Sequence, residues 1–375
     1  MAEKLRVGLV GTGFGTHVHL PAYRACDAVE VVAVCSAQLP RAKKAAEDFG
    51  VPWYTDDYRQ LVQRSDVDLV DVCTPPDTHL EITLAAIDAG KHVLAEKPLA
   101  LDATQATAMR DQMAGAGLVN VVNHEMRYTP VRRRIRGLVA EGFLGRVQYV
   151  VATVNADHGT DPSKEPYYWG WVGQADKGGG FLMSSLSHHI DLLRFCFGDI
   201  DGVQGRVTTL ITERPVLTFE YRDGDPIGAD TPTVGLRAVD ADDTAVFTGT
   251  LAGGGLISVS GSWSIRFPGG VRLEAYGDRG SLHLMPDGRL LGARNGDAEL
   301  TELRPEATLP SIPGAHYLVP NFVALATEMA EVVNGSLDQK EAIFATFEDG
   351  ARLQAIIDEV KGAPNRAGPA PGSGT

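Results

Sequence analysis

The chain has 375 residues, 44% hydrophobic and 22% charged, so it is long enough for two domains and a large core. Lysine and arginine number 34 against 48 aspartates and glutamates, and the net charge of −14 argues against nucleic acid or a membrane as partner. No apolar run approaches the roughly 20 residues that cross a bilayer, and the N-terminus has no signal-peptide core. The cysteines form no Cys-x-x-Cys pair, so we expect reduced thiols, no metal site and a cytoplasmic protein.

Short apolar runs alternate with helix-like segments over the first 123 residues. The apolar runs are residues 6–10, 29–35, 68–73, 92–96 and 119–123, and the helix-like segments are 20–25, 40–50, 80–89 and 103–114. Near-continuous apolar strands separated by helices are typical of a parallel sheet that is covered on both faces. This α/β pattern predicts a Rossmann domain, with a doubly wound parallel sheet, over residues 1–123.

The pattern changes after residue 123. From residue 203 to residue 284 strands follow one another without helices between them, which predicts a large open, mainly antiparallel sheet. We therefore predict a second α/β domain over residues 124–361. Within it, residues 214–240 are rich in Asp, Gly and Pro and are interpreted as an added loop. Residues 362–375 are rich in Gly, Pro, Ser and Ala and are predicted to be disordered.

A glycine-rich turn follows the first apolar run. Gly11, Gly13 and Gly15 stand where a strand ends and a helix begins, with Phe14 among them. Glycine there permits a tight turn and lets a pyrophosphate approach the backbone, and the helix N-terminus offers free N–H groups. The third glycine of the G-x-G-x-x-G pattern would fall at Thr16, so Gly15 is one residue early. We predict a dinucleotide site here, with a plain tight turn as the alternative.

The second apolar run bears on which nucleotide binds. It ends in Val34-Cys35-Ser36-Ala37 and contains no Asp or Glu to accept a hydrogen bond from the ribose 2′-OH of NAD. Ser36 can donate to a 2′-phosphate, and Arg41 can neutralise it. This favours NADP over NAD, although Arg41 also fits the solvated face of a helix.

Several motifs occur in a characteristic order. They are GTGFGTHVHLPAY at 11–23, TPPDTH at 74–79, AGKHVLAEKPLA at 89–100 and GGGFLMSSLSHHID at 178–191. With these motifs the sequence resembles the glucose–fructose oxidoreductase and inositol dehydrogenase family (Gfo/Idh/MocA). The resemblance implies a substrate domain that forms homodimers or homotetramers through its sheet. It also implies that certain side chains lie along the cofactor or face its nicotinamide: Thr74, Pro75, Pro76, His79, Glu96 and Lys97. A cis peptide before Pro98 is implied as well.

The catalytic prediction rests on Lys97. When hydride reaches a carbonyl carbon, the oxygen needs a proton donor and a nearby positive charge, and a lysine supplies both. The alternative is a lysine in a salt bridge, perhaps with Glu96. The family's commonest form carries an Asp and, four residues later, a His on one helix face. Here Ser184 stands at the Asp position and His188 at the His position, so His188 is predicted as the second acid/base or as a ligand of the reacting hydroxyl.

Further substrate contacts are expected around this pair. The resemblance places Asn123, Arg127 and Tyr128 in the cleft as contacts to hydroxyl or carboxylate groups. Glu96, Ser184 and Asp191 are also expected to contact substrate, with Asp191 either holding His188 or making a structural hydrogen bond. Trp169 belongs to an aromatic loop that suits a sugar ring and suits packing on a neighbouring subunit equally well. The arginines of the helix at 131–141 are interpreted as a solvated or interface face, and His189 as a packing residue.

The predicted function is an NAD(P)-dependent oxidoreductase that acts on a secondary alcohol or ketone of a sugar, cyclitol or sugar-like metabolite. Two alternatives stay open: a non-catalytic regulator that binds nucleotide and sugar, and a glycosidase that uses bound NAD for transient oxidation. The sequence does not identify the substrate, the direction of reaction or the oligomer size.

Overall fold

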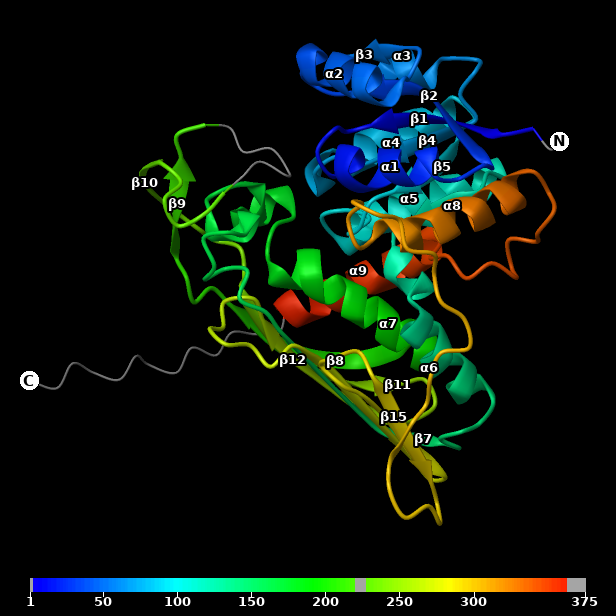
Figure 1. The fold of residues 1–375 in the computed structure, drawn as a ribbon, viewed down its shortest axis with the longest axis vertical. Helices are drawn as coiled ribbons and strands as arrows, with labels where there is room; N and C mark the ends of the chain where they lie inside the picture. The colour runs from blue at the N-terminus through cyan, green and yellow to red at the C-terminus, as the bar shows by residue number, and fades with distance from the viewer. Residues whose placement is uncertain (1–2, 220–226, 363–375) are drawn as a thin grey trace, which may run out of the picture.

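The computed structural model describes residues 3–219 and 227–362, so the predicted disordered tail, apart from Gly362, lies outside the described residues. The N-terminal half contains a six-stranded sheet with the strand order β3-β2-β1-β4-β5-β6 (Figure 1). All neighbouring strands in this sheet are parallel. Its strands are β1 (Leu5–Val10), β2 (Val29–Cys35), β3 (Tyr54–Thr55), β4 (Leu69–Val72), β5 (His92–Ala95) and β6 (Asn120–Val122). This is the doubly wound Rossmann order, as the sequence predicts.

Helices connect these strands and cover the sheet. They are η1 (Gly15–His19), α1 (Leu20–Arg24), α2 (Leu39–Phe49), α3 (Tyr58–Val62), η2 (Pro76–Thr78), α4 (His79–Asp88) and α5 (Ala103–Ala116). Local sequence sets their ends: Asp102 accepts a hydrogen bond from the Gln105 N–H at the start of α5. Gly117 follows α5 with a φ of 66°, a left-handed conformation that glycine adopts without strain. Strand β3 and helix α3 are too short to show a sequence period, and the sequence reading missed them.

The C-terminal half contains an eight-stranded sheet with the order β16-β15-β14-β13-β7-β12-β11-β8. Only β7 and β12 pair in parallel within it, so the sheet is mixed and mainly antiparallel, as predicted. Its strands are β7 (Val147–Asn155), β8 (Ile200–Thr208), β11 (Thr244–Leu251), β12 (Leu256–Ser262), β13 (Val271–Gly277), β14 (Gly280–Leu284), β15 (Leu290–Arg294) and β16 (Thr301–Glu302).

One face of this sheet is covered by helices that lie between it and the Rossmann half (Figure 1). They are α6 (Pro130–Ala140), the π-helical turn η7 (Leu182–Leu186), α7 (Ser187–Phe197) and α9 (Phe347–Gly362). Strand β11 shows the pattern that this requires, since Ala245, Phe247 and Leu251 are buried while Val246 faces outward. Short 3-10 turns complete the loops: η3 (Glu125–Tyr128), η4 (Glu165–Tyr167), η5 (Trp171–Gly173) and η6 (Ala175–Lys177).

The end of the chain returns to the Rossmann half. Helix α8 (Val319–Val333) places Phe322 with its ring centre 4.2 Å from that of His19 and 5.2 Å from that of Tyr23. The backbone of Ala345 pairs with that of Val122, at the end of β6. These contacts tie the two halves together around the carboxyl ends of the Rossmann strands, where ligands bind in folds of this type.

The segment expected to be an added loop contains a β-hairpin. Strands β9 (Glu213–Leu217) and β10 (Thr233–Ala238) form a two-stranded antiparallel sheet apart from the large one. Residues 220–226, between the two strands, lie outside the described residues. Among the described residues, no helix is long and apolar enough to cross a membrane.

Candidate active site

The glycine turn joins β1 to η1 at the carboxyl edge of the Rossmann sheet. Gly11 has a φ of +116°, and a Cβ there would lie 1.9 Å from the carbonyl oxygen of Cys73, so only glycine fits. A Cβ at Gly13 would meet nothing within 4 Å, which leaves open space beside the turn. A Cβ at Gly15 would lie 3.1 Å from Leu9. Gly15 therefore permits the close packing of helix on strand that the third glycine of the pattern normally provides.

Ser36 lies at the tip of β2, next to this turn. It is buried, and its hydroxyl accepts a hydrogen bond of 2.9 Å from Thr12 of the glycine turn. No carboxylate stands at the end of β2, between Ser36 and Gln38. Arg41 follows in the first turn of α2.

The loop after β4 carries the residues that the resemblance places along the cofactor. Thr74 is half-buried and Pro75 is exposed, whereas Pro76 is buried. The ring of His79 is fully buried, with Nε2 2.8 Å from the Thr74 carbonyl and Nδ1 3.1 Å from the Pro98 carbonyl. Burial lowers the pKa of His79. His79 thus acts within the protein, by holding the Thr74 loop against the segment that follows Lys97.

Lys97 stands directly after β5 and points across to the C-terminal half. Its ammonium donates a 2.9 Å hydrogen bond to the carbonyl of Ser184, on the π-helical turn η7. The peptide bond between Lys97 and Pro98 is cis, as the resemblance implies. The predicted alternative, a Lys97–Glu96 side-chain salt bridge, is absent from the described residues, because the Glu96 carboxylate turns inward.

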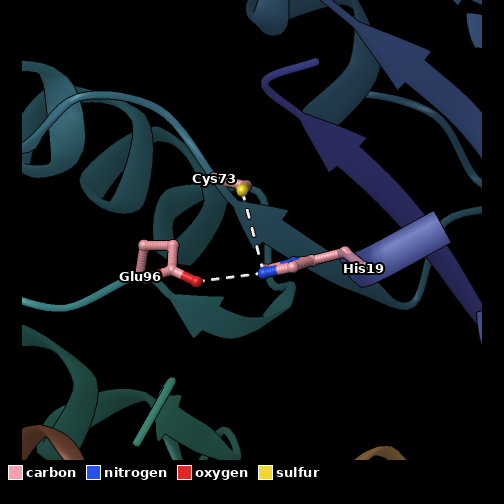
Figure 2. A group of neighbouring side chains, drawn as sticks. All are labelled: His19, Cys73 and Glu96. Carbon is pink, nitrogen blue, oxygen red and sulfur yellow. Dashed lines mark hydrogen bonds and ion pairs between the residues drawn. The ribbon is translucent and has the colours of Figure 1, made fainter. Parts of the chain in front are cut away.

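Glu96 belongs to a buried polar network that the sequence reading missed (Figure 2). His19 Nε2 lies 3.0 Å from Glu96 Oε1, and His19 Nδ1 lies 2.7 Å from Asp71 Oδ2. Asn123 also donates to Glu96 Oε1, at 2.6 Å, while its own Oδ1 is buried without a protein partner. Two signals in the sequence could have found this network: an aspartate within the apolar run of β4, and a histidine in the GTGFGTHVHLPAY motif.

The groups opposite Lys97 have few protein partners. The Ser184 hydroxyl and His188 Nδ1 are buried without a hydrogen bond, and so are both ring nitrogens of His124. The rings of His124 and His188 meet edge to face, 5.6 Å apart. Burial, followed by the charge of Lys97, lowers the pKa of His188 well below its usual value, so the imidazole is neutral. Buried polar atoms without partners are rare in folded proteins, and here they gather beside one ammonium group.

Arg127, Tyr128 and Asp191 are all deeply buried. The Arg127 guanidinium donates hydrogen bonds from two nitrogens to the Asp191 carboxylate, at 2.9 and 2.6 Å. Tyr128 donates its hydroxyl hydrogen bond to Glu328 of α8. The pKa of Asp191 is about 2, because Arg127 and His124 outweigh the effect of burial. The predicted substrate contacts of these residues stay predictions, since the hydrogen bonds observed for them lie within the protein.

Trp169 packs against the hairpin of β9 and β10. Its Nε1 donates to the Ala238 carbonyl at 3.1 Å, and the guanidinium of Arg237 stacks 4.6 Å above its ring. Its backbone N–H donates to Pro215 of β9. Packing is therefore the observed role of Trp169, and contact with a sugar stays a prediction.

Two further residues shape the C-terminal side of the site. Asp242 accepts a 2.8 Å hydrogen bond from the Leu182 N–H and so holds the start of η7, which carries Ser184. Arg132 donates to the His188 carbonyl and is only 5% exposed. The expectation of a solvated arginine face on α6 is wrong for Arg132, because it shares the buried side of the helix with Ile135 and Leu138.

The residues present fit a nicotinamide nucleotide. The open space at Gly13 beside a helix N-terminus suits a pyrophosphate, and the orphaned polar atoms of Ser184, His188 and Asn123 suit a polar ligand next to Lys97. Comparison with known proteins agrees with this interpretation. The profile of the oxidoreductase family with an NAD-binding Rossmann fold matches residues 5–124, and that of the GFO/IDH/MocA C-terminal domain matches residues 132–283. The chain therefore belongs to the Gfo/Idh/MocA family of NAD-binding oxidoreductases.

Individual relatives share about a quarter to a third of their residues with this chain. A levoglucosan dehydrogenase from Pseudarthrobacter phenanthrenivorans is 31% identical over 290 residues, which cover 75% of this chain and 73% of the relative. A 1,5-anhydro-D-fructose reductase from Ensifer adhaerens is 36% identical over 171 residues, 45% of this chain and 50% of the relative. A solved levoglucosan dehydrogenase in complex with NADH and levoglucosan superimposes with a TM-score of 0.81, at 25% identity, over 96% of this chain and 97% of the other.

Proposed function

We propose that the protein transfers hydride between a nicotinamide nucleotide and a secondary alcohol or ketone of a cyclic sugar or sugar-like metabolite, with Lys97 as the proton donor or acceptor. The observation that carries the proposal is the position of the Lys97 ammonium. It crosses from the Rossmann half to within 2.9 Å of the Ser184 carbonyl, next to the unpartnered hydroxyl of Ser184 and ring nitrogen of His188. A polar, half-buried site with several unused hydrogen-bonding atoms suits a ligand with several hydroxyl groups.

Each residue then has a defined task. Bound nicotinamide supplies or takes up the hydride. In reduction, Lys97 gives its proton to the oxygen of the reacting carbon; in oxidation it takes that proton from the hydroxyl. Neutral His188 accepts or donates one hydrogen bond at Nδ1, which orients the reacting group. Ser184 supplies a hydroxyl where the family's commonest form has a carboxylate, so this side of the site carries less negative charge.

For the nucleotide, we propose a preference for NADP over NAD. The support is the absence of a carboxylate between Ser36 and Gln38 at the end of β2, together with the Ser36 hydroxyl and the cationic Arg41 near by. Calorimetric titration of the nucleotide-stripped protein with NADH and NADPH tests this. Tighter binding of NADPH is expected, whereas tighter binding of NADH would contradict the preference without affecting the proposed reaction.

For the assembly, we propose a homodimer or homotetramer formed through the outer face of the large sheet. Leu256 of β12 and Tyr149 of β7 stand opposite each other in register and are 58% and 41% exposed. Val246 on β11 is also exposed, farther along the sheet beside Ser260 of β12. Exposed apolar side chains on a sheet face are typical of a protein interface. Light scattering coupled to gel filtration should give a multiple of the 40.0 kDa chain mass.

Turnover assays test the reaction itself. The purified protein is incubated with NAD⁺ or NADP⁺ and levoglucosan, and with NADH or NADPH and 1,5-anhydro-D-fructose, with nicotinamide absorbance as the readout. Lys97→Met removes the ammonium and keeps the length of the side chain. We expect a fall in kcat by a factor of about 10²–10⁴ with nucleotide binding unchanged. Full turnover by the variant would exclude Lys97 as the acid/base.

Two outcomes would favour the other functions considered from the sequence. Binding of nucleotide and sugar without turnover, in every combination of a wider panel of sugars, would support a regulator. Cleavage of a glycoside without net change of nicotinamide would support a glycosidase.

A further inference from the structure

His19 lies at the centre of the buried network, next to Cys73 and Glu96 (Figure 2). Its side chain is 0% exposed and bridges two carboxylates, with Nδ1 2.7 Å from Asp71 and Nε2 3.0 Å from Glu96. Tyr23 also donates to Asp71, at 2.8 Å. A carboxylate oxygen at each ring nitrogen favours the imidazolium, which can donate to both, while the Asn123 amide nitrogen also lies 3.3 Å from Nε2.

The charges in the network support the same protonation state. Burial disfavours a charged imidazole, but the adjacent carboxylate of Asp71 outweighs it and raises the pKa of His19 well above its usual value. Burial likewise opposes ionised Glu96, yet its contacts with His19 bring the pKa of Glu96 to about 2. The directions of both shifts therefore favour an imidazolium at His19 beside an ionised Glu96.

Glu96 passes this restraint on to Lys97. Its Oε1 accepts from His19 and Asn123, and its Oε2 accepts from the backbone N–H of Lys97 at 3.0 Å. The carboxylate thus holds the peptide that carries Lys97 through its backbone N–H. Moving Glu96 would move the backbone from which the Lys97 side chain reaches Ser184.

The same residues raise the question of a metal ion. His19, Cys73 and Glu96 place ligand atoms within 4.8 Å of one another. However, His19 Nε2 is already 3.0 Å from Glu96, and burial raises the pKa of the Cys73 thiol to about 11, so the sulfur is not the thiolate that binds metals. The bonds of His19 to Asp71 and Glu96 therefore favour a hydrogen-bonded network over a metal site.

We propose that His19 is a positioning residue, an imidazolium held by Asp71 that fixes the Glu96 carboxylate and, through it, the backbone of Lys97. The kinetic part of this proposal rests on the proposed oxidoreductase function, whereas the charge of His19 does not. Other titratable groups face the network from the elements around it: Tyr23 of α1, Cys73 after β4, His79 of α4, Lys97 after β5 and Glu125 of η3.

The charge is tested without any substrate. Nitrogen-15 NMR of labelled histidine side chains distinguishes protonated from neutral imidazole, and the His19 signals are identified by their loss in His19→Gln. We expect both nitrogens of His19 to stay protonated from pH 5 to pH 9. A neutral imidazole at pH 7 would overturn the proposal. If His19→Gln does not fold, Asp71→Asn serves instead, and we expect it to shift the His19 signals toward the neutral form as the pH rises.

Kinetics test the positioning, with the sugar that turns over in the assay above. We expect His19→Gln to lower kcat by about 10–100-fold, because small displacements of a reacting group have effects of this size, while nucleotide affinity changes by less than about threefold. Tyr23→Phe is the matched control, since it removes a neighbouring buried bond to the same Asp71 carboxylate without touching Glu96. Its kcat should fall by less than about threefold. Equal losses in the two variants would contradict the proposal.

A double-mutant cycle separates positioning from general stability. If His19 acts through Glu96, His19→Gln combined with Glu96→Gln should have the kcat of Glu96→Gln alone, whereas independent effects would multiply and overturn the proposal. A pH profile gives a second readout. In His19→Gln the Glu96 carboxylate loses its cation and its pKa rises, so kcat should fall as the pH is lowered, in a range where the wild-type protein stays active. If the wild-type protein turns over no sugar at all, the proposed function fails while the NMR result still decides the state of His19.

Discussion

Two regions meet at Lys97, and they differ in how many of their buried polar atoms have hydrogen-bond partners. On the Rossmann side, His19 bonds to both Asp71 and Glu96 in the interior, and only the oxygens Asp71 Oδ1 and Asn123 Oδ1 of this network lack a partner among the described residues. On the side of η7 and α7, the Ser184 hydroxyl and His188 Nδ1 are also buried but have no hydrogen-bond partner among the described residues. A paired buried group stabilises or positions, whereas an unpaired one costs free energy unless a ligand completes it. We infer from this contrast that the first side holds the lysine in place, and we expect the second side to receive the substrate.

Removing one partner of a buried ion pair should lower the stability of the fold, and we expect the largest effect of this kind from Arg127→Met. Arg127 and Asp191 form a buried, two-pronged ion pair, and removing one partner leaves an uncompensated charge. We expect a loss of about 3–5 kcal/mol in the free energy of unfolding, measured by urea denaturation. Arg136→Met is the control, because its guanidinium stacks on the same Phe195 ring from an exposed position. A loss no greater than in the control would show that the pair is not structural.

Breaking an unpaired group should damage activity instead. His188→Asn is expected to lower kcat by about 100-fold, the lower end of general acid–base effects, with a smaller loss of unfolding free energy than Arg127→Met, because no hydrogen bond of Nδ1 to the described residues is lost. The adjacent His189→Asn is the matched control, since His189 is buried on the same helix and points in another direction around it. If the two variants have the same kcat, His188 has no part in the reaction.

Asp242 holds the start of η7, so its titration tests how this turn is stabilised. Burial raises the pKa of Asp242 from 3.8 to about 6, so its protonated form favours the folded state. The corresponding stability is complete below about pH 4 and is lost as the pH rises through about 6, a change of about 2–3 kcal/mol. Asp242→Asn keeps the acceptor for Leu182 and removes the titration. Thermal unfolding of both proteins between pH 4 and pH 8 should show the extra fall only in the wild type; parallel curves would contradict the assignment.

The smallest expected effect is that of Ser184→Ala. One lost hydrogen bond to a sugar hydroxyl should raise KM by about 3–10-fold, which corresponds to about 1 kcal/mol. Ser187→Ala is the control. Ser187 begins α7, directly after η7, and its hydroxyl donates a hydrogen bond to the Ser184 carbonyl. An unchanged KM in Ser184→Ala would show that the unpartnered hydroxyl does not meet the substrate.

Much of the fold follows from the pattern of apolar residues along the sequence. Near-continuous apolar runs define β1, β2, β4, β5 and β6, because parallel strands are buried on both faces. Alternation of buried and exposed side chains marks β11 and β12, because helices cover one face of the second sheet and the other face is open. Strand β3 and the hairpin of β9 and β10 were not predicted, since short strands and strands in an Asp- and Gly-rich segment give no periodic signal.

The sequence by itself determined the glycine turn and the helix that carries Ser184 and His188, because local motifs encode them, and the family resemblance implied the cis Lys97–Pro98 peptide. Only the tertiary structure decided what these residues meet. Glu96 adjoins Lys97 in sequence yet turns inward to His19, which lies 77 positions earlier. Arg127 points to Asp191, and Arg132 is buried although its neighbours Arg133 and Arg136 are exposed. Such partners come from different elements, and their proximity arises only when the two halves pack around the end of the Rossmann sheet.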